Sequence, residues 1–147
     1  VIAGHSMGGA SAFQLAAMLG EENIDVASLI QIDSVDPFHP GYEGDLSNVK
    51  RRYNFSSGGI VQGPVNIKGA GKNNFNLSYT THRNIDQASL VQQTVVREVI
   101  QAEQNRRQQE LYGFFMAPLS EFGSLANFWM ARYNDMMAAQ STPPTSK

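Results

Sequence analysis

Several residue types and patterns are scarce in this 147-residue sequence, and each shortage excludes a class of protein. Cysteine is absent, so the chain has no disulfide framework, no thiolate nucleophile and no thiolate metal site. No apolar run reaches the roughly 18 residues that a membrane-spanning helix needs. A net charge of −2 provides no excess of positive charge for a nucleic-acid partner. With 41% hydrophobic residues, the composition indicates a globular domain with a core of its own.

The most specific pattern lies at the beginning of the sequence. An apolar pair precedes the residues GHSMGG at 4–9, and an Ala-rich amphipathic segment follows at 10–19. The spacing G-x-S-x-G between a strand and a helix is typical of a nucleophile elbow, in which a serine lies on a strained turn. Here the serine is Ser6, and the lack of side chains at Gly4 and Gly8 would let the strand and the helix approach closely. In the alternative interpretation Ser6 is a helix N-cap whose hydroxyl group accepts a hydrogen bond from the first helical turn.

Helical and strand patterns alternate along the rest of the chain. Residues 6–19 predict a helix that stops at Gly20. Strands are predicted at 26–33 and 49–57, and the alternation of apolar and polar residues within 63–82 predicts a pair of strands around a Gly/Asn-rich turn. Parallel strands that alternate with helices indicate the α/β class.

A long helix is predicted from about residue 85 to residue 110. The apolar stripe of the first helix is expected to consist of Phe13, Ala16, Ala17 and Met18, and that of the long helix of Ile85, Leu90, Val91, Val95, Val96, Val99 and Ile100.

A serine becomes a good nucleophile only when a base takes its proton and an acceptor orients that base. The sequence has three histidines. His5 is next to Ser6 and is expected to point away from it, and His39 lies between two prolines. His82 ends the last predicted strand segment before the long helix, where an open α/β sheet presents its catalytic groups. We therefore predict His82 as the base; the alternative is a polar loop residue that caps the helix.

Two carboxylates, one at the end of the strand at 26–33 and one shortly after it, could orient the base. Asp33 is the residue at the end of the strand, where rigid backbone would hold it, whereas Asp36 lies in the loop before Pro37. Either residue could instead be a turn former, because Asp favours such positions. We predict Asp33 as the acid and keep Asp36 as the alternative; Ser, Asp, His is the order that the α/β-hydrolase scaffold uses.

The segments GHSMGG, LIQIDSVDP and THRNID together resemble the C-terminal half of a serine α/β hydrolase of the lipase, esterase or thioesterase kind. An acid directly after the strand that follows the nucleophile helix is similar to the arrangement in pancreatic-type lipases, and residues 32–37 echo their acid segment. The resemblance covers residues 1 to about 105. It implies an α/β-hydrolase doubly wound sheet of which this chain is the C-terminal part, with the N-terminal strands missing and residues 1–110 as a partial catalytic domain.

The resemblance also implies a role for each site residue. Ser6 would attack the carbonyl group of an ester or thioester, His82 would remove and return the proton, and Asp33 would orient His82. The backbone N–H of Met7 would be one oxyanion donor, and no cofactor or metal is implied. The partner would be a small-molecule or lipid acyl substrate. Because the second oxyanion donor would come from an earlier strand, we expect little turnover from this chain by itself.

Two other functions stay open at this point. An acyltransferase would use the same triad, and a non-catalytic or degenerate hydrolase-fold binding domain would be favoured if His82 pointed away from Ser6. Residues 111–139 predict an aromatic and Met-rich helical segment, and residues 140–147 a disordered tail. The aromatic segment is either core or a lid, membrane-interface or oligomer contact; its candidate contact residues are Phe122, Leu125, Phe128 and Trp129.

Overall fold

Four parallel strands form one sheet in the computed structural model, which describes residues 1–35, 44–64 and 66–140. Their order in the sheet is β1-β2-β3-β4, so β1 and β4 lie at its two edges. This confirms the α/β class and the parallel arrangement of the strands. The strands are β1 (Ile2–His5), β2 (Leu29–Ile32), β3 (Arg52–Ser57) and β4 (Asn74–Leu77).

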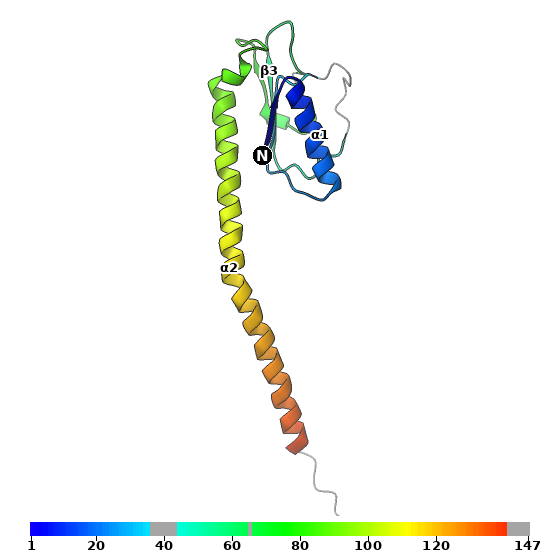
Figure 1. Cartoon of the computed structure of the whole chain (residues 1–147), viewed down its shortest axis with the longest axis vertical. Coiled ribbons are helices and arrows are strands. Elements are labelled where there is room, and N and C mark those ends of the chain that lie inside the picture. The colour runs from blue at the N-terminus through cyan, green and yellow to red at the C-terminus, as the bar shows by residue number, and fades with distance from the viewer. Residues whose placement is uncertain (36–43, 65, 141–147) are drawn as a thin grey trace, which may run out of the picture. The chain divides into compact units, whose positions relative to one another are not determined.

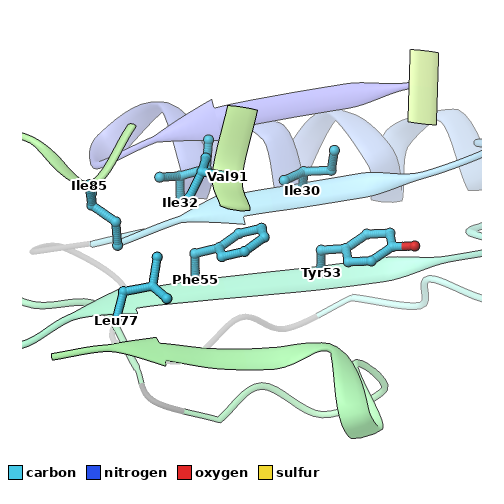
Figure 2. Packing of buried hydrophobic residues seen from close by; sticks show 7 residues of the cluster. All are labelled: Ile30, Ile32, Tyr53, Phe55, Leu77, Ile85 and Val91. Atoms are coloured by element: carbon cyan, nitrogen blue, oxygen red, sulfur yellow. The ribbon is translucent and has the colours of Figure 1, made fainter. Parts of the chain in front are cut away.

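Helices cover both faces of the sheet (Figure 1). On one face α1 (Met7–Glu21) packs its Phe13 and Ala16 against Leu29 of β2. On the other face Val91, near the start of α2 (Ser89–Gln140), packs on side chains of the three strands β2 to β4. Figure 2 shows the second cluster, which consists of Ile30, Ile32, Tyr53, Phe55, Leu77, Ile85 and Val91. The alternation of side chains along β2 explains why one strand serves both cores.

The helix predicted at 6–19 is present as α1, but its end and part of its buried face differ from the prediction. Gly20 lies inside the helix, which ends at Glu21. Phe13 and Ala16 are buried as expected, whereas Met18 is 61% exposed. Four of the five buried residues of α1, namely Gly9, Ala12, Phe13 and Ala16, fall at i, i+3, i+4 and i+7, with Ala10 beside them; residue 18 lies outside that stripe.

The prediction of a strand pair within 63–82 was wrong. Of the described residues in this range, only β4 is a strand, and it pairs in parallel with β3. Side chains take the place of the expected partner strand: Asn74 Oδ1 accepts from the Ile67 N–H at 2.9 Å, and Asn54 Nδ2 donates to the Pro64 carbonyl at 2.8 Å. The Pro64 carbonyl and the Ile67 N–H therefore have partners without a strand ladder, which alternation of apolar residues cannot reveal.

The long helix α2 begins at Ser89, after a short 3₁₀ helix η2 (Ile85–Gln87). Its predicted apolar face is only partly the buried one: Val91 is 1% exposed, but Val96 and Val99 are 57% and 51% exposed. Leu90 and Ile100 are also exposed, so these four members of the predicted stripe were wrong. The buried side of the helix instead includes two polar residues, Thr94 and Glu98.

Glu98 is buried because the sheet supplies partners for its carboxylate. Its Oε2 accepts from the Ser28 hydroxyl at 2.5 Å and from Arg51 Nε at 2.6 Å, and its Oε1 accepts from the Tyr53 hydroxyl at 2.8 Å. Burial by itself raises the pKa of Glu98, but the hydrogen bonds from Ser28, Tyr53 and Arg51 outweigh it and hold the pKa below its ordinary value. The carboxylate therefore ties α2 to β2 and β3.

The variant Glu98→Gln should lower the free energy of unfolding at pH 7 by about 2 kcal/mol, because the donors that meet this carboxylate lose a charged acceptor. The folded pKa is depressed, so the contribution is fully present above the unfolded pKa of about 4.3 and is lost as the pH falls through the folded pKa. Urea titrations at pH 7 and pH 3 should show a difference in the free energy of unfolding between the wild type and Glu98→Gln that shrinks in acid. The exposed Glu110, paired with Arg106, is the control: Glu110→Gln should change stability by less than about 0.5 kcal/mol at either pH. If the difference in stability between the wild type and Glu98→Gln were the same at both pH values, the ionised carboxylate of Glu98 would not be its cause.

The chain divides into two compact units, Val1–Glu103 and Gln104–Lys147. The first contains the sheet, α1 and the beginning of α2; in the second, α2 continues through the predicted aromatic segment at 111–139. Large apolar side chains of the second unit are exposed, among them Leu111, Tyr112, Phe114, Phe128 and Met130. The side chains of Phe122, Leu125 and Trp129, and residues 141–147 of the predicted tail, lie outside what the structure describes.

Candidate active site

Ser6 lies on the turn between β1 and α1. Its φ of 57° and ψ of −129° place a non-glycine residue in the left-handed region, which stores strain. Its backbone is fixed on both sides: the N–H donates to the Ile32 carbonyl at 3.0 Å, and the carbonyl accepts from Gly9 and Val35. Ser6 occupies the N-cap position of α1, but its side chain makes no capping hydrogen bond, so the interpretation of its hydroxyl as a helix cap is wrong.

Glycine is required at two positions around this turn, and one of them was mispredicted. A Cβ on Gly4 would lie 2.0 Å from the carbonyl oxygen of Gly8, and a Cβ on Gly9 would lie 2.6 Å from Ser34 Cβ. A Cβ on Gly8 would meet nothing within 4 Å. Gly4 thus allows the close approach of β1 and α1 as predicted, whereas Gly8 is not limited by space, and Gly9 leaves room for the Ser34 side chain.

His82 lies in the loop that follows β4, and its ring contacts both predicted partners. Nε2 is 2.8 Å from Ser6 Oγ, and Nδ1 is 2.8 Å from Asp33 Oδ2. A carboxylate accepts hydrogen bonds and cannot donate, so Nδ1 carries the hydrogen and Nε2 is left to accept from the Ser6 hydroxyl. The three side chains therefore form a continuous hydrogen-bonded chain in the polarity that general-base catalysis requires.

Asp33 follows β2 directly and is fully buried. Besides His82, its carboxylate accepts from the Ser57 N–H at 3.0 Å, the Ser57 hydroxyl at 2.6 Å and the Gly63 N–H at 2.7 Å. Burial acts to raise the pKa of Asp33, but the hydrogen bonds from Ser57, Gly63 and His82 together hold it below its ordinary value. The group is therefore an anion at neutral pH, held in place by backbone and side-chain donors. The alternative acid, Asp36, lies outside the described residues.

Met7 is the first residue of α1 and immediately follows Ser6. Backbone N–H groups in the first turn of a helix have no carbonyl partner within that helix, and they lie at its positive end. The Met7 N–H therefore has no carbonyl partner within α1, and it belongs to the residue next to Ser6. Its side chain is 56% exposed.

Three contributors to the site were missed in the sequence. Ser57 and Gly63 hold Asp33, and His5 contacts His82. Ser57 could have been found, because it lies at the carboxyl end of one predicted strand, on the same side of the sheet where Asp33 ends a neighbouring strand. Gly63 carried no such signal, since nothing local indicates that its loop returns to β2. His5 was expected to point away from Ser6; its ring lies 4.9 Å from the ring of His82, centroid to centroid.

Two other functional features are absent from the part of the chain that the structure describes. No group of three or more His, Asp or Glu residues is arranged to hold a metal ion. Among the described helices, none has a stretch that is both long and apolar enough for a membrane span.

Compared with known proteins, the chain matches no family model, no curated protein and no solved structure.

Proposed function

We propose that this chain carries the catalytic triad of a serine hydrolase that cleaves a carboxylic ester or thioester through an acyl-enzyme on Ser6. The observation that carries the proposal is the hydrogen-bonded chain from Ser6 Oγ through His82 to Asp33, with both contacts at 2.8 Å. The strained backbone of Ser6 adds support, because such strain is concentrated at functional sites. The fold would then be the C-terminal part of an α/β-hydrolase sheet.

The geometry supports a two-step reaction. His82 Nε2 takes the hydroxyl proton as Ser6 Oγ attacks the acyl carbonyl, and the Met7 N–H stabilises the resulting oxyanion. The tetrahedral intermediate collapses, and His82 gives its proton to the leaving alcohol or thiol. Water then attacks the acyl-enzyme with His82 again as base, which releases the carboxylic acid and restores Ser6. Throughout, the Asp33 anion orients His82 and stabilises its imidazolium form.

The geometry bears differently on the two alternative functions, a non-catalytic binding domain and an acyltransferase. A non-catalytic binding domain would have been favoured by a His82 turned away from Ser6, and the 2.8 Å separation does not favour it. An acyltransferase differs only in the acceptor that attacks the acyl-enzyme. Since the described residues provide one oxyanion donor in Met7, we expect slow turnover from the chain by itself, and covalent labelling is the more sensitive measurement.

A fluorophosphonate probe should label the protein once, with the phosphonate on Ser6 when the site is mapped by mass spectrometry. The reason is that only a serine with a hydrogen-bonded base displaces fluoride rapidly. Ser6→Ala should abolish labelling. Ser11, an exposed serine on α1 whose hydroxyl donates to the Met7 carbonyl, is the matched control, and Ser11→Ala should label like the wild type.

Labelling that survives Ser6→Ala would sink the assignment of the nucleophile. A short-chain acyl ester or thioester added first should slow labelling, which would show that acyl compounds enter the same site. If an added amine or alcohol accelerates release of the acyl group and becomes acylated, the reaction is transfer rather than hydrolysis.

A further inference from the structure

His5, the residue before Ser6, contacts the backbone of the predicted base. Its Nε2 lies 2.8 Å from the carbonyl oxygen of His82. A carbonyl oxygen can only accept, so Nε2 of His5 carries the hydrogen and donates it. The two residues are 77 positions apart in the sequence, and the contact is partly buried. A side chain on the strand of the nucleophile thus binds the main chain of the base.

The topology explains why such a contact is needed. Ser6 follows β1 and His82 follows β4, and these two strands are the opposite edges of the sheet. Neighbouring strands lie about 4.8 Å apart, so β1 and β4 are roughly 14 Å apart. The loop after β4 must therefore cross the ends of β3 and β2 before His82 reaches Ser6.

The hydrogen bonds at the start of that loop lie on the β3 and β4 side. The Thr80 hydroxyl donates to the Leu77 carbonyl at 2.7 Å, the Gly58 N–H donates to the Thr80 carbonyl at 3.1 Å, and the Thr81 N–H donates to Asn84 Oδ1 at 2.7 Å. On the β1 side, the hydrogen bond from His5 joins this strand to the main chain of His82 rather than to its reacting side chain. It therefore adds a restraint on the main chain of His82 from β1 to the contacts that its ring makes with Ser6 and Asp33.

We propose that His5 is a positioning residue, which holds the backbone of His82 at β1 so that Nε2 of His82 stays within hydrogen-bond distance of the Ser6 hydroxyl. The effect on rate rests on the proposed function, whereas the effect on the position of His82 does not. A displacement of about 1 Å between reacting groups can lower a rate by about a hundredfold. His5 touches no reacting atom, so its loss should act on the acylation step and leave substrate affinity nearly unchanged.

Three substitutions separate the hydrogen bond from the ring and from polarity. His5→Phe keeps a ring beside His82 and removes the donor. His5→Asn keeps an amide donor but places it too close to β1 to reach the carbonyl, whereas His5→Gln places an amide N–H at about the position of Nε2. We expect the Phe and Asn variants to label with the fluorophosphonate roughly ten to a hundred times more slowly, and the Gln variant within about threefold of the wild type.

A second measurement does not depend on activity. In protein labelled with ¹⁵N-histidine, the Nδ1–H of His82 should give a slowly exchanging signal in the wild type and in His5→Gln, because its hydrogen bond to Asp33 is held in place. In His5→Phe and His5→Asn the signal should broaden and exchange faster with water. Thermal unfolding of each variant identifies any that fails to fold. If His5→Phe or His5→Asn fails, the comparison of the other one with His5→Gln still shows whether the hydrogen bond holds His82 in place.

The outcomes are distinct. Slow labelling and a mobile His82 signal in His5→Phe and His5→Asn, with both properties restored in His5→Gln, support the positioning role. Equal losses in all three variants, or wild-type behaviour in all three, would overturn it. If the wild type itself is not labelled at Ser6, the proposed function fails, and the His82 signal alone then decides whether His5 positions that residue.

Discussion

Replacing Asp33 by Asn should slow the acylation of Ser6 by about 10⁴-fold, the size of the effect in triads of this kind. As at Glu98, the loss of a buried charged acceptor should also lower the free energy of unfolding at pH 7, by about 2 kcal/mol. The Asn oxygen can still accept from the backbone N–H groups of Ser57 and Gly63, which now bind Oδ1 of Asp33. Its amide nitrogen then faces His82 and donates to Nδ1. The hydrogen of the ring moves to Nε2, which can no longer accept from the Ser6 hydroxyl.

The measurement is the rate of fluorophosphonate labelling, or of acyl-ester cleavage where turnover is detectable, together with urea unfolding of each variant. Asp36→Asn is the informative control, because Asp36 is the other carboxylate that the sequence offers for this role. It should label within about threefold of the wild type. A larger loss for Asp36→Asn than for Asp33→Asn would make Asp36 the acid, despite the 2.8 Å contact between Asp33 and His82.

The second large effect is on folding, at the close approach of β1 and α1. Gly4→Ala should lower the free energy of unfolding by about 3 kcal/mol, since its Cβ would lie 2.0 Å from the backbone oxygen of Gly8 and backbone cannot rotate aside. The turn that carries Ser6 would also shift, so labelling should slow in the fraction that still folds.

Gly8→Ala is the matched control for this prediction. Its Cβ would meet no atom within 4 Å, and alanine is more favourable than glycine in a helix by up to about 1 kcal/mol. Stability should therefore stay the same or rise slightly. Denaturant titrations followed by circular dichroism would measure both variants. Equal destabilisation by the two substitutions would show that the motif's glycines are needed for backbone conformation rather than for space.

The sequence alone was sufficient for features that depend on local periodicity and turn chemistry. The class of fold, the position of α1 and the strand–turn–helix setting of Ser6 all follow from apolar spacing and from glycines in adjacent residues. Asp33 could be preferred because it ends a strand, and a strand end holds a side chain rigidly. The roles of these residues in catalysis stay a prediction that the labelling experiment tests.

Only the tertiary structure decided which groups satisfy one another across the sheet. Glu98 is buried because Ser28, Arg51 and Tyr53 meet it there, so the buried face of α2 could not be found from hydrophobicity. The segment before β4 forms no described strand, because asparagine side chains bind its backbone. The contact of His5 with His82 arises where the loop from one sheet edge reaches the other. Such long-range pairings leave no periodic trace in a single sequence, because each depends on where several distant segments end together.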